Sequence, residues 1–296
     1  MLLNPLYYTE QHLAFAESVR RFTEKEISPF ITKWDEAETF PRELYKKAAD
    51  IGLLGVGFDE NYGGIAGTDA FYTLLASVEL AKCASGGLAA SLLSHTIGTP
   101  PIQHFAQEEV KAEVLPQILS GEKISALAIT EPSGGSDVAA LKTKAVRDGN
   151  DYIVSGEKTF ITSGIRADYY SVAVRTDPNA KGANGISMLL IDAHSEGITK
   201  SKLDKMGWWA SDTAHLHFDS LRVPAKNLLG AENMGFFVIM NNFNMERFFL
   251  AASSYGYALV CYEEALDWAK QRQTFGKRLI DHQVVRHKLV DMATRL

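Results

Sequence analysis

The chain has little cysteine, no excess of basic residues and no long apolar run. Its two cysteines, Cys83 and Cys261, are too few for a disulfide framework and too far apart for a C-x-x-C metal or redox motif. A net charge of -6 argues against a nucleic-acid partner, because phosphates require concentrated lysine and arginine. The sequence lacks an apolar run of roughly 18 residues, and its N-terminus lacks a basic segment before an apolar core. We therefore expect no membrane span and no secretory signal, a cytoplasmic or equivalent compartment, and small molecules or proteins as partners.

Length and composition are those of an ordinary globular protein. The 296 residues are enough for about two domains of typical size with a sizeable core. Apolar residues make up 46% and charged residues 22% of the chain, so disorder is not predicted.

Residues 9–120 have a helical pattern. Thr9 is a candidate N-cap, and apolar residues follow it at near-helical spacing. The glycines Gly52, Gly55 and Gly57 form a G-x-x-G-x-G run. A dinucleotide-binding fingerprint needs a strand before the glycines, and here a helical segment precedes them. We therefore reject a Rossmann site.

From Lys123 the pattern changes to short β-branched segments. Residues 144–147 and 152–155 flank Asp148-Gly149-Asn150, which predicts a hairpin. Further strands are predicted at 169–175, 185–191 and 214–218, with Val223-Pro224 closing the sheet. His215 and His217 would share one face of the last strand, but without a third ligand nearby no metal site is predicted.

A long helical pattern covers residues 235–272 and would extend over roughly 55 Å at 1.5 Å per residue. Gly276 ends it, and another helix is predicted near Asp281. One amphipathic helix and the beginning of a second cannot bury their own apolar faces, so this third region looks unfinished.

The run from Ile129 to Asp137, ITEPSGGSD, follows an apolar segment that predicts a short buried strand. Glycine lets main-chain N–H groups approach a ligand closely, and Thr130 and Ser136 add hydroxyl donors. The run could therefore hold a cofactor. On these residues alone, a polar surface turn is the competing interpretation.

Glu246 is the outstanding ionisable residue of the long helix. Its neighbours on the helix face are Asn242, Phe243, Phe249 and Leu250, none of which is a cation. Loss of solvation on such a face raises the pKa of a carboxyl group toward the range that suits a general base. The alternative is a glutamate that reaches water or pairs with a distant arginine. Arg247 cannot share that face and could bind a phosphate or an interface carboxylate.

The segment from Arg272 to Arg278, with His282-Gln283 after it, joins cations, a hydroxyl and an aromatic ring at a helix-to-helix turn. It could bind a pyrophosphate. The alternative is a basic helix C-terminus that complements its own dipole.

Together these segments resemble the acyl-CoA dehydrogenase family. The resemblance rests on ITEPSGGSD (129–137), FITSG (160–164), KMGWWASDT (205–213), NMER (244–247) and RQTFGKRLIDHQ (272–283), with a YGG turn at 62–64. It implies an α+β protein with an N-terminal α-helical domain (1–120), a middle β-barrel domain (121–228) and a C-terminal α-helical domain (229–296), the last incomplete in this chain.

The resemblance also implies FAD as cofactor and assigns residues to it by position. The flavin would be lined by Leu127, Ile129, Thr130, Ser136, Phe160 and Thr162. Arg272, Thr274 and Gln283 match positions that reach the FAD of a neighbouring subunit. Ser136, Asn244 and Arg247 match positions near the acyl-CoA. Relatives often carry a larger aromatic residue where this chain has Leu127 and Phe160, so stacking on the flavin would differ in detail.

The implied reaction is the α,β-dehydrogenation of a fatty acyl-CoA to the trans-2-enoyl-CoA. A glutamate removes the α-proton, hydride passes to FAD, and an electron-transfer flavoprotein accepts the electrons from a homodimer or homotetramer. The compartment would be the cytoplasm, or the mitochondrial matrix in a eukaryote. Family branches place the glutamate on the long helix or much further along the chain. Glu246 occupies the first location, as in the long-chain and isovaleryl-type branches, and medium or long straight-chain substrates are expected.

Two alternatives accompany this interpretation. An oxidase-like flavoenzyme of the same fold would pass electrons to oxygen. A truncated protein without catalytic activity would serve in binding or assembly, because members of the family run longer than this chain.

Overall fold

A computed structural model describes residues 7–296. The first six residues of the predicted helical domain, which are also part of the N-terminus screened for a secretory signal, lie outside the described residues. The next part of the chain is helical, as predicted, and Thr9 accepts a hydrogen bond from the His12 N–H as the N-cap. Its helices are α1 Glu10–Phe22, α2 Ile31–Glu36, α3 Glu43–Asp50, α4 Ala70–Ala81, α5 Gly86–Leu92, α6 His95–Gly98, α7 Pro100–Phe105 and α8 Glu108–Leu119. The glycine run follows α3 and leads into a 3₁₀ turn, which supports the rejection of a Rossmann site.

The middle of the chain forms a seven-stranded mixed sheet. Its strands are β1 Ser125–Ala128, β2 Lys144–Asp148, β3 Asp151–Thr162, β4 Tyr169–Arg175, β5 Ile186–Asp192, β6 Ile198–Lys202 and β7 Thr213–Pro224. The predicted hairpin between β2 and β3 is present, and Gly149 adopts a positive φ of 61° in its turn. β6 was not predicted. It is a short edge strand whose lysines break the apolar alternation that marks other strands.

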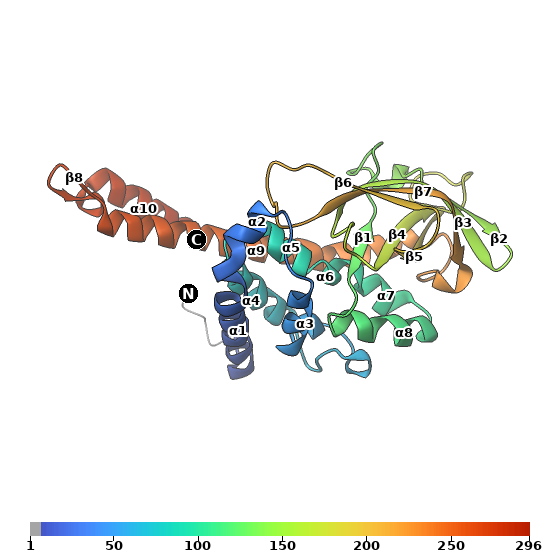
Figure 1. Ribbon diagram of the computed structural model, residues 1–296, viewed down its shortest axis with the longest axis horizontal. Coiled ribbons are helices and arrows are strands. Elements are labelled where there is room, and N and C mark those ends of the chain that lie inside the picture. The colour runs from blue at the N-terminus through green and yellow to red at the C-terminus, as the bar shows by residue number, and fades with distance from the viewer. Residues whose placement is uncertain (1–6) are drawn as a thin grey trace.

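The sheet curves into a half-barrel. β1 runs parallel to β4, β5 pairs antiparallel with β4 at one edge, and β6 pairs with β7 at the other. The α+β class is confirmed, with helices before and after the sheet in the chain (Figure 1). Because β1 and β3 lie close together, the segments that follow them meet at one end of the sheet.

The long helix α9 spans Gly235–Gln271, close to the predicted bounds, and α10 spans Gln283–Arg295. A small hairpin of β8 Gln273–Thr274 and β9 Lys277–Arg278 joins them and was not predicted. The end of α9, this hairpin and α10 form an arm (residues 268–296) that extends away from the body of the molecule (Figure 1). No helix among residues 7–296 is both long and apolar enough to cross a membrane.

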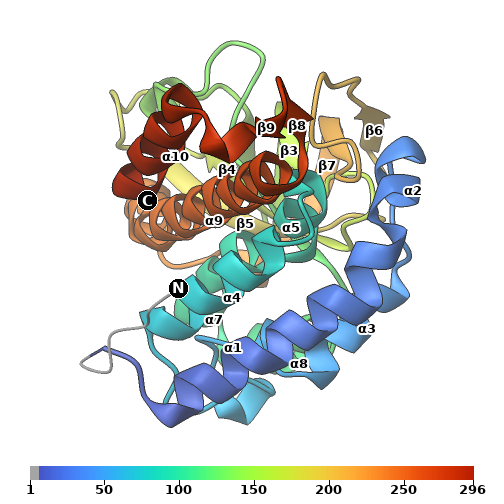
Figure 2. The ribbon, with the colours of Figure 1, turned by 90° about the vertical axis from the view of Figure 1, so that its left-hand side faces the viewer.

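Helix α9 packs on the first helical region over its middle part. Figure 2 shows α1, α4 and α9 lying side by side as successive layers. A Cβ added at Gly256 would come within 2.6 Å of the Ala81 Cβ, so this close crossing of α9 and α4 requires glycine. The arm lies beyond this contact.

Candidate functional site

The segment after β1 forms a wall at one end of the sheet. The Thr159 N–H of β3 donates to the Thr130 carbonyl at 2.9 Å, which holds the segment against β3. Leu127 is half-buried beside the core, and Ile129 is 8% exposed within it. Ile129 can therefore offer a ligand mainly its backbone, whereas Thr130 has a partly exposed side chain.

A tight turn shapes the rest of this loop. The Glu131 N–H donates to the Gly134 carbonyl at 3.1 Å, and the Gly134 N–H returns a bond of 3.0 Å to the Glu131 carbonyl. A Cβ at Gly135 would lie 3.0 Å from the Thr130 methyl carbon, so this position is tight for any other residue. A Cβ at Gly134 would meet no atom within 4 Å. The loop therefore faces open space with Ser136 exposed at its edge.

Phe160 and Thr162 come from the end of β3, next to the same loop. Phe160 has a positive φ of 60° and is 69% exposed, which is an unusual conformation and position for a large apolar residue. A bulge between Lys158 and Ile161 produces this change of direction. Such backbone strain persists only where surrounding contacts impose it.

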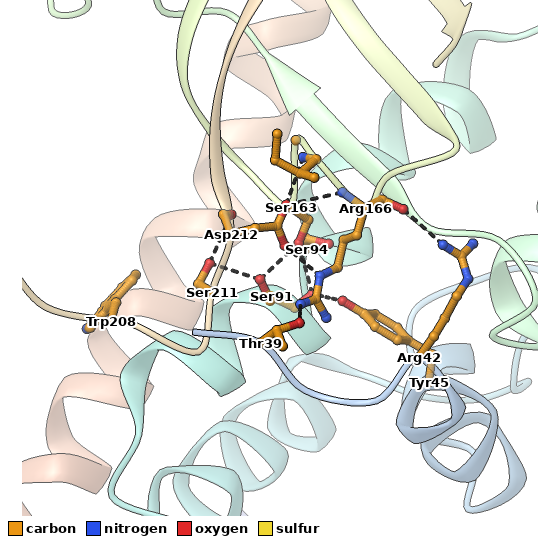
Figure 3. A network of polar contacts seen from close by, with 12 residues as sticks. Thr39, Arg42, Tyr45, Ser91, Ser94, Ser163, Arg166, Trp208, Ser211 and Asp212 are labelled. Atoms are coloured by element: carbon orange, nitrogen blue, oxygen red, sulfur yellow. Dashed lines mark hydrogen bonds and ion pairs between the residues drawn. The ribbon is translucent and has the colours of Figure 1, made fainter. Parts of the chain in front are cut away.

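A buried polar network supplies those contacts for the turn after Thr162 (Figure 3). The Ser163 N–H donates to the Asp212 carbonyl at 2.9 Å, and the Ile165 N–H donates to Asp212 Oδ2 at 2.7 Å. Ser163 Oγ also donates to Ser91 Oγ on α5 at 3.1 Å. The turn is thus bonded both to β7 and to the helical region.

The network continues outward through arginines. Arg166 pairs with Asp212 and donates to Thr39 Oγ1 at 3.0 Å, while Arg42 donates to the Arg166 carbonyl at 3.0 Å. Tyr45 donates to the Ser91 carbonyl at 2.9 Å, and burial raises the pKa of this tyrosine to about 12. Sequence reasoning missed these partners because they lie far apart in the chain.

The loop and the end of β3 together present an aromatic ring, hydroxyl groups and main-chain N–H groups around open space. This set fits a flat, partly polar ring such as a flavin, which needs one apolar face and several donors at its edge. The structure brings Leu127, Ile129, Thr130, Phe160 and Thr162 to this end of the sheet, with Ser136 at the rim of the loop.

Glu246 lies elsewhere, on α9, in a cavity of about 410 Å³ against the helical region. Burial raises the pKa of Glu246, and the neighbouring Arg247 lowers it to a smaller extent. Among residues 7–296 no cation forms an ion pair with this carboxylate. The cavity is also lined by Val56, Gly57, Phe58, Thr73, Thr96, Pro100, Gln103, His104, Asn241, Asn242, Asn244, Met245 and Phe249.

The short helix α6 separates this cavity from β1. Asn242 on α9 donates to the Ile97 carbonyl at 2.8 Å, and a Cβ at Gly98 would lie 2.9 Å from the Ala126 backbone. The two proposed halves of the site are therefore one short helix apart. Asn244 shares the cavity with Glu246, whereas Arg247 is exposed and its guanidinium lies 5.6 Å from the Phe243 ring centroid.

Arg272, Thr274 and Gln283 lie on the arm, far from the loop after β1 (Figure 1). Arg272 and Gln283 are exposed, and Thr274 Oγ1 lies 3.2 Å from His282 Nε2. Within one chain these residues do not meet the other proposed FAD contacts.

His215 and His217 both lie near Glu157, at 3.7 and 3.5 Å from its carboxylate oxygens. No group of three or more metal-ligating side chains with suitable geometry is found in the part of the chain that the structure describes.

Comparison with known proteins places this architecture. Models of the acyl-CoA dehydrogenase N-terminal, middle and C-terminal domains match residues 9–122, 126–221 and 233–296. An acyl-CoA dehydrogenase of Bacillus subtilis (strain 168) is 38% identical over 98% of this chain and 76% of its own. The mitochondrial long-chain specific acyl-CoA dehydrogenase of Sus scrofa is 38% identical over 98% of this chain and 67% of its own. The acyl-CoA dehydrogenase structure from Geobacillus kaustophilus superposes with a TM-score of 0.93 at 41% identity, covering 97% of this chain and 76% of that one.

A helical region, a half-barrel and a long helix with this similarity define a flavin-dependent oxidoreductase that acts on CH–CH bonds. The chain belongs to the acyl-CoA dehydrogenase family. Members of the family depend on FAD, and a similar structure, glutaryl-CoA dehydrogenase from Mycobacterium smegmatis, is a complex with FADH2.

Proposed function

We propose that this chain catalyses the FAD-dependent α,β-dehydrogenation of a medium- or long-chain fatty acyl-CoA to the trans-2-enoyl-CoA, with Glu246 as the base. The observation that supports this proposal is a carboxylate in a cavity without a cationic partner, whose pKa burial raises. A base with a raised pKa takes a proton more readily while remaining ionised near neutral pH.

The proposed base acts on the carbon next to the thioester carbonyl. Loss of that proton is difficult unless donors stabilise the developing enolate and water is excluded. Asn244 lies beside Glu246 and can position the thioester portion, and Arg247 offers an exposed cation to an anionic part of coenzyme A. Partial burial of Glu246 keeps bulk water from competing for the proton.

The loop after β1 and the end of β3 would hold FAD. Thr130, Ser136 and Thr162 offer hydroxyl groups, and Phe160 and Leu127 offer apolar surface. When bound there, FAD supplies the acceptor for the hydride that leaves the β-carbon. The chain's part is to fix the distance and angle between the two ligands.

Arg272, Thr274 and Gln283 would complete the FAD site of a second subunit, which requires a homodimer or homotetramer. We propose an electron-transfer flavoprotein as acceptor, since a similar structure at 35% identity is titled as the electron transferring flavoprotein of Acidaminococcus fermentans. The relatives from a bacterium and from mitochondria suggest the cytoplasm or the mitochondrial matrix as the compartment.

The test is Glu246→Gln in the flavin-loaded protein, with acyl-CoAs of graded length added without oxygen. We expect flavin bleaching to slow by about a thousandfold, because general-base catalysis is lost while the size of the side chain is kept. Glu264→Gln, an exposed change on the same helix, is the matched control and should bleach normally. Unchanged bleaching in Glu246→Gln would exclude Glu246 as the base. A wild-type protein that binds no FAD would refute the proposed activity itself.

A further inference from the structure

A buried ion pair lies directly behind the loop that we propose for FAD. Lys158 on β3 is 0% exposed, and its Nζ donates to the Ile129 carbonyl at 3.0 Å and to Glu131 Oε1 at 2.8 Å. Ile129 and Glu131 flank Thr130, whose own carbonyl accepts from Thr159. One ammonium group therefore fixes the backbone on both sides of a proposed flavin contact.

The Glu131 carboxylate closes the other end of the loop. It accepts from the Lys142 N–H at 2.6 Å and from the Thr143 N–H at 2.9 Å. Thr143 Oγ1 donates to the Glu157 carbonyl at 3.0 Å. Residues 132–141 are thus held as a closed loop by a single side chain that lies at its base.

Stability alone is a weak explanation for this arrangement. Removing two charges from water is costly, and apolar residues of similar size often stabilise a core as well as a buried pair does. Here burial lowers the pKa of Lys158 to about 8, against the opposite effect of Glu131. The contacts of the pair beyond each other are backbone groups of the loop and its ends.

We propose that Lys158 and Glu131 are positioning residues that hold loop 129–143 in the conformation able to bind FAD. The proposal rests on the proposed function, because it assumes that this loop is a wall of the FAD site. Neither side chain needs to touch the cofactor. Their role is to keep Thr130 and the turn at Gly134–Gly135 in place before FAD arrives, which lowers the entropy cost of binding.

The test uses Lys158→Met, Glu131→Leu and the double variant in the full chain, with Lys144→Met as an exposed control for loss of one lysine charge. Each single variant leaves a buried charge unpaired, so its melting temperature should fall. The double variant removes both charges and should recover most of that loss.

Two measurements then separate positioning from stability. Amide hydrogen exchange of the FAD-free protein should show loss of protection at Lys142 and Thr143 in the double variant, while the rest of the sheet keeps its protection. FAD titration by flavin fluorescence should show binding weakened by about tenfold or more in the double variant and unchanged in Lys144→Met.

Wild-type exchange at these amides or wild-type FAD affinity in the double variant would overturn the proposal. If the single variants do not fold, the double variant alone decides. If the wild-type protein binds no FAD, the proposed function fails, and the exchange data still show whether the pair orders the loop.

Discussion

Two parts of the molecule carry residues that we assign to one cofactor, and they are held in opposite ways. The loop after β1 and the end of β3 are fixed by buried bonds to Lys158, Asp212 and Ser91. The arm is exposed and relies on local contacts such as the Arg278–Asp281 pair, whose side chains are 54% and 40% exposed. One part is prepared before any ligand binds, whereas the other presents its side chains to a second molecule.

The largest expected effect comes from removing a buried acid in the first part. Asp212→Ala leaves Arg166 and the N–H groups of Ile165 and Arg166 without their acceptor. Because the Asp212 side chain is 7% exposed, we expect a loss of about 3 kcal/mol in the free energy of unfolding, measured by urea denaturation. Asp281→Ala on the arm should cause no measurable change. Similar losses in both variants would contradict the comparison.

A smaller effect should come from His95, which lies next to the same helical support. His95 is 3% exposed, and neither ring nitrogen has a hydrogen-bond partner. Burial lowers its pKa to about 4, against a smaller opposite effect of the Leu92 and Leu54 carbonyls. The unfolded chain therefore binds more protons than the folded one between about pH 6.5 and pH 4.

Stability must consequently fall as the pH decreases through this window. From pH 7 to pH 5 we expect His95 to cost roughly 2 kcal/mol, and His95→Leu should remove this part of the dependence. Urea denaturation at the two pH values measures the difference. His287→Asn, on the exposed arm, serves as the control and should keep the wild-type pH dependence. An equal dependence in His95→Leu would show that other groups cause it.

The sequence predicts those features of fold and site that depend on neighbouring residues. The β2–β3 hairpin follows from Asp148-Gly149-Asn150, and the helical pattern after Gly235 predicts α9. Glu246 could be singled out because its helix neighbours carry no cation. The edge strand β6 and the β8–β9 hairpin are too short and polar to give a periodic signal.

Contacts between distant segments could not be predicted in this way. Ser91 meets Ser163 and Ser211 only because α5 packs at the end of the sheet, and the sequence does not contain that geometry. Lys158 did leave a signal. It follows Tyr152 and Val154 on the inward-facing side of β3, where a lysine requires a buried acceptor.

The smallest expected effect lies on the arm and tests where its side chains act. Arg272→Ala should leave stability unchanged, because Arg272 is exposed, and should weaken FAD binding by about tenfold through loss of a charged donor. Alone, this result would not show whose FAD the arginine contacts.

Mixing two inactive variants answers that question. In a hybrid of Glu246→Gln and Arg272→Ala subunits, the site that keeps Glu246 would receive Arg272 from its neighbour and become complete, whereas the other site would lack both. Random exchange in a dimer should then restore about a quarter of wild-type activity at limiting FAD. If Arg272 acts within its own chain, each site of the hybrid lacks one residue and no activity returns. The arm would then have to fold back onto the loop after β1, and the contrast between a prepared site and an exposed arm would be wrong.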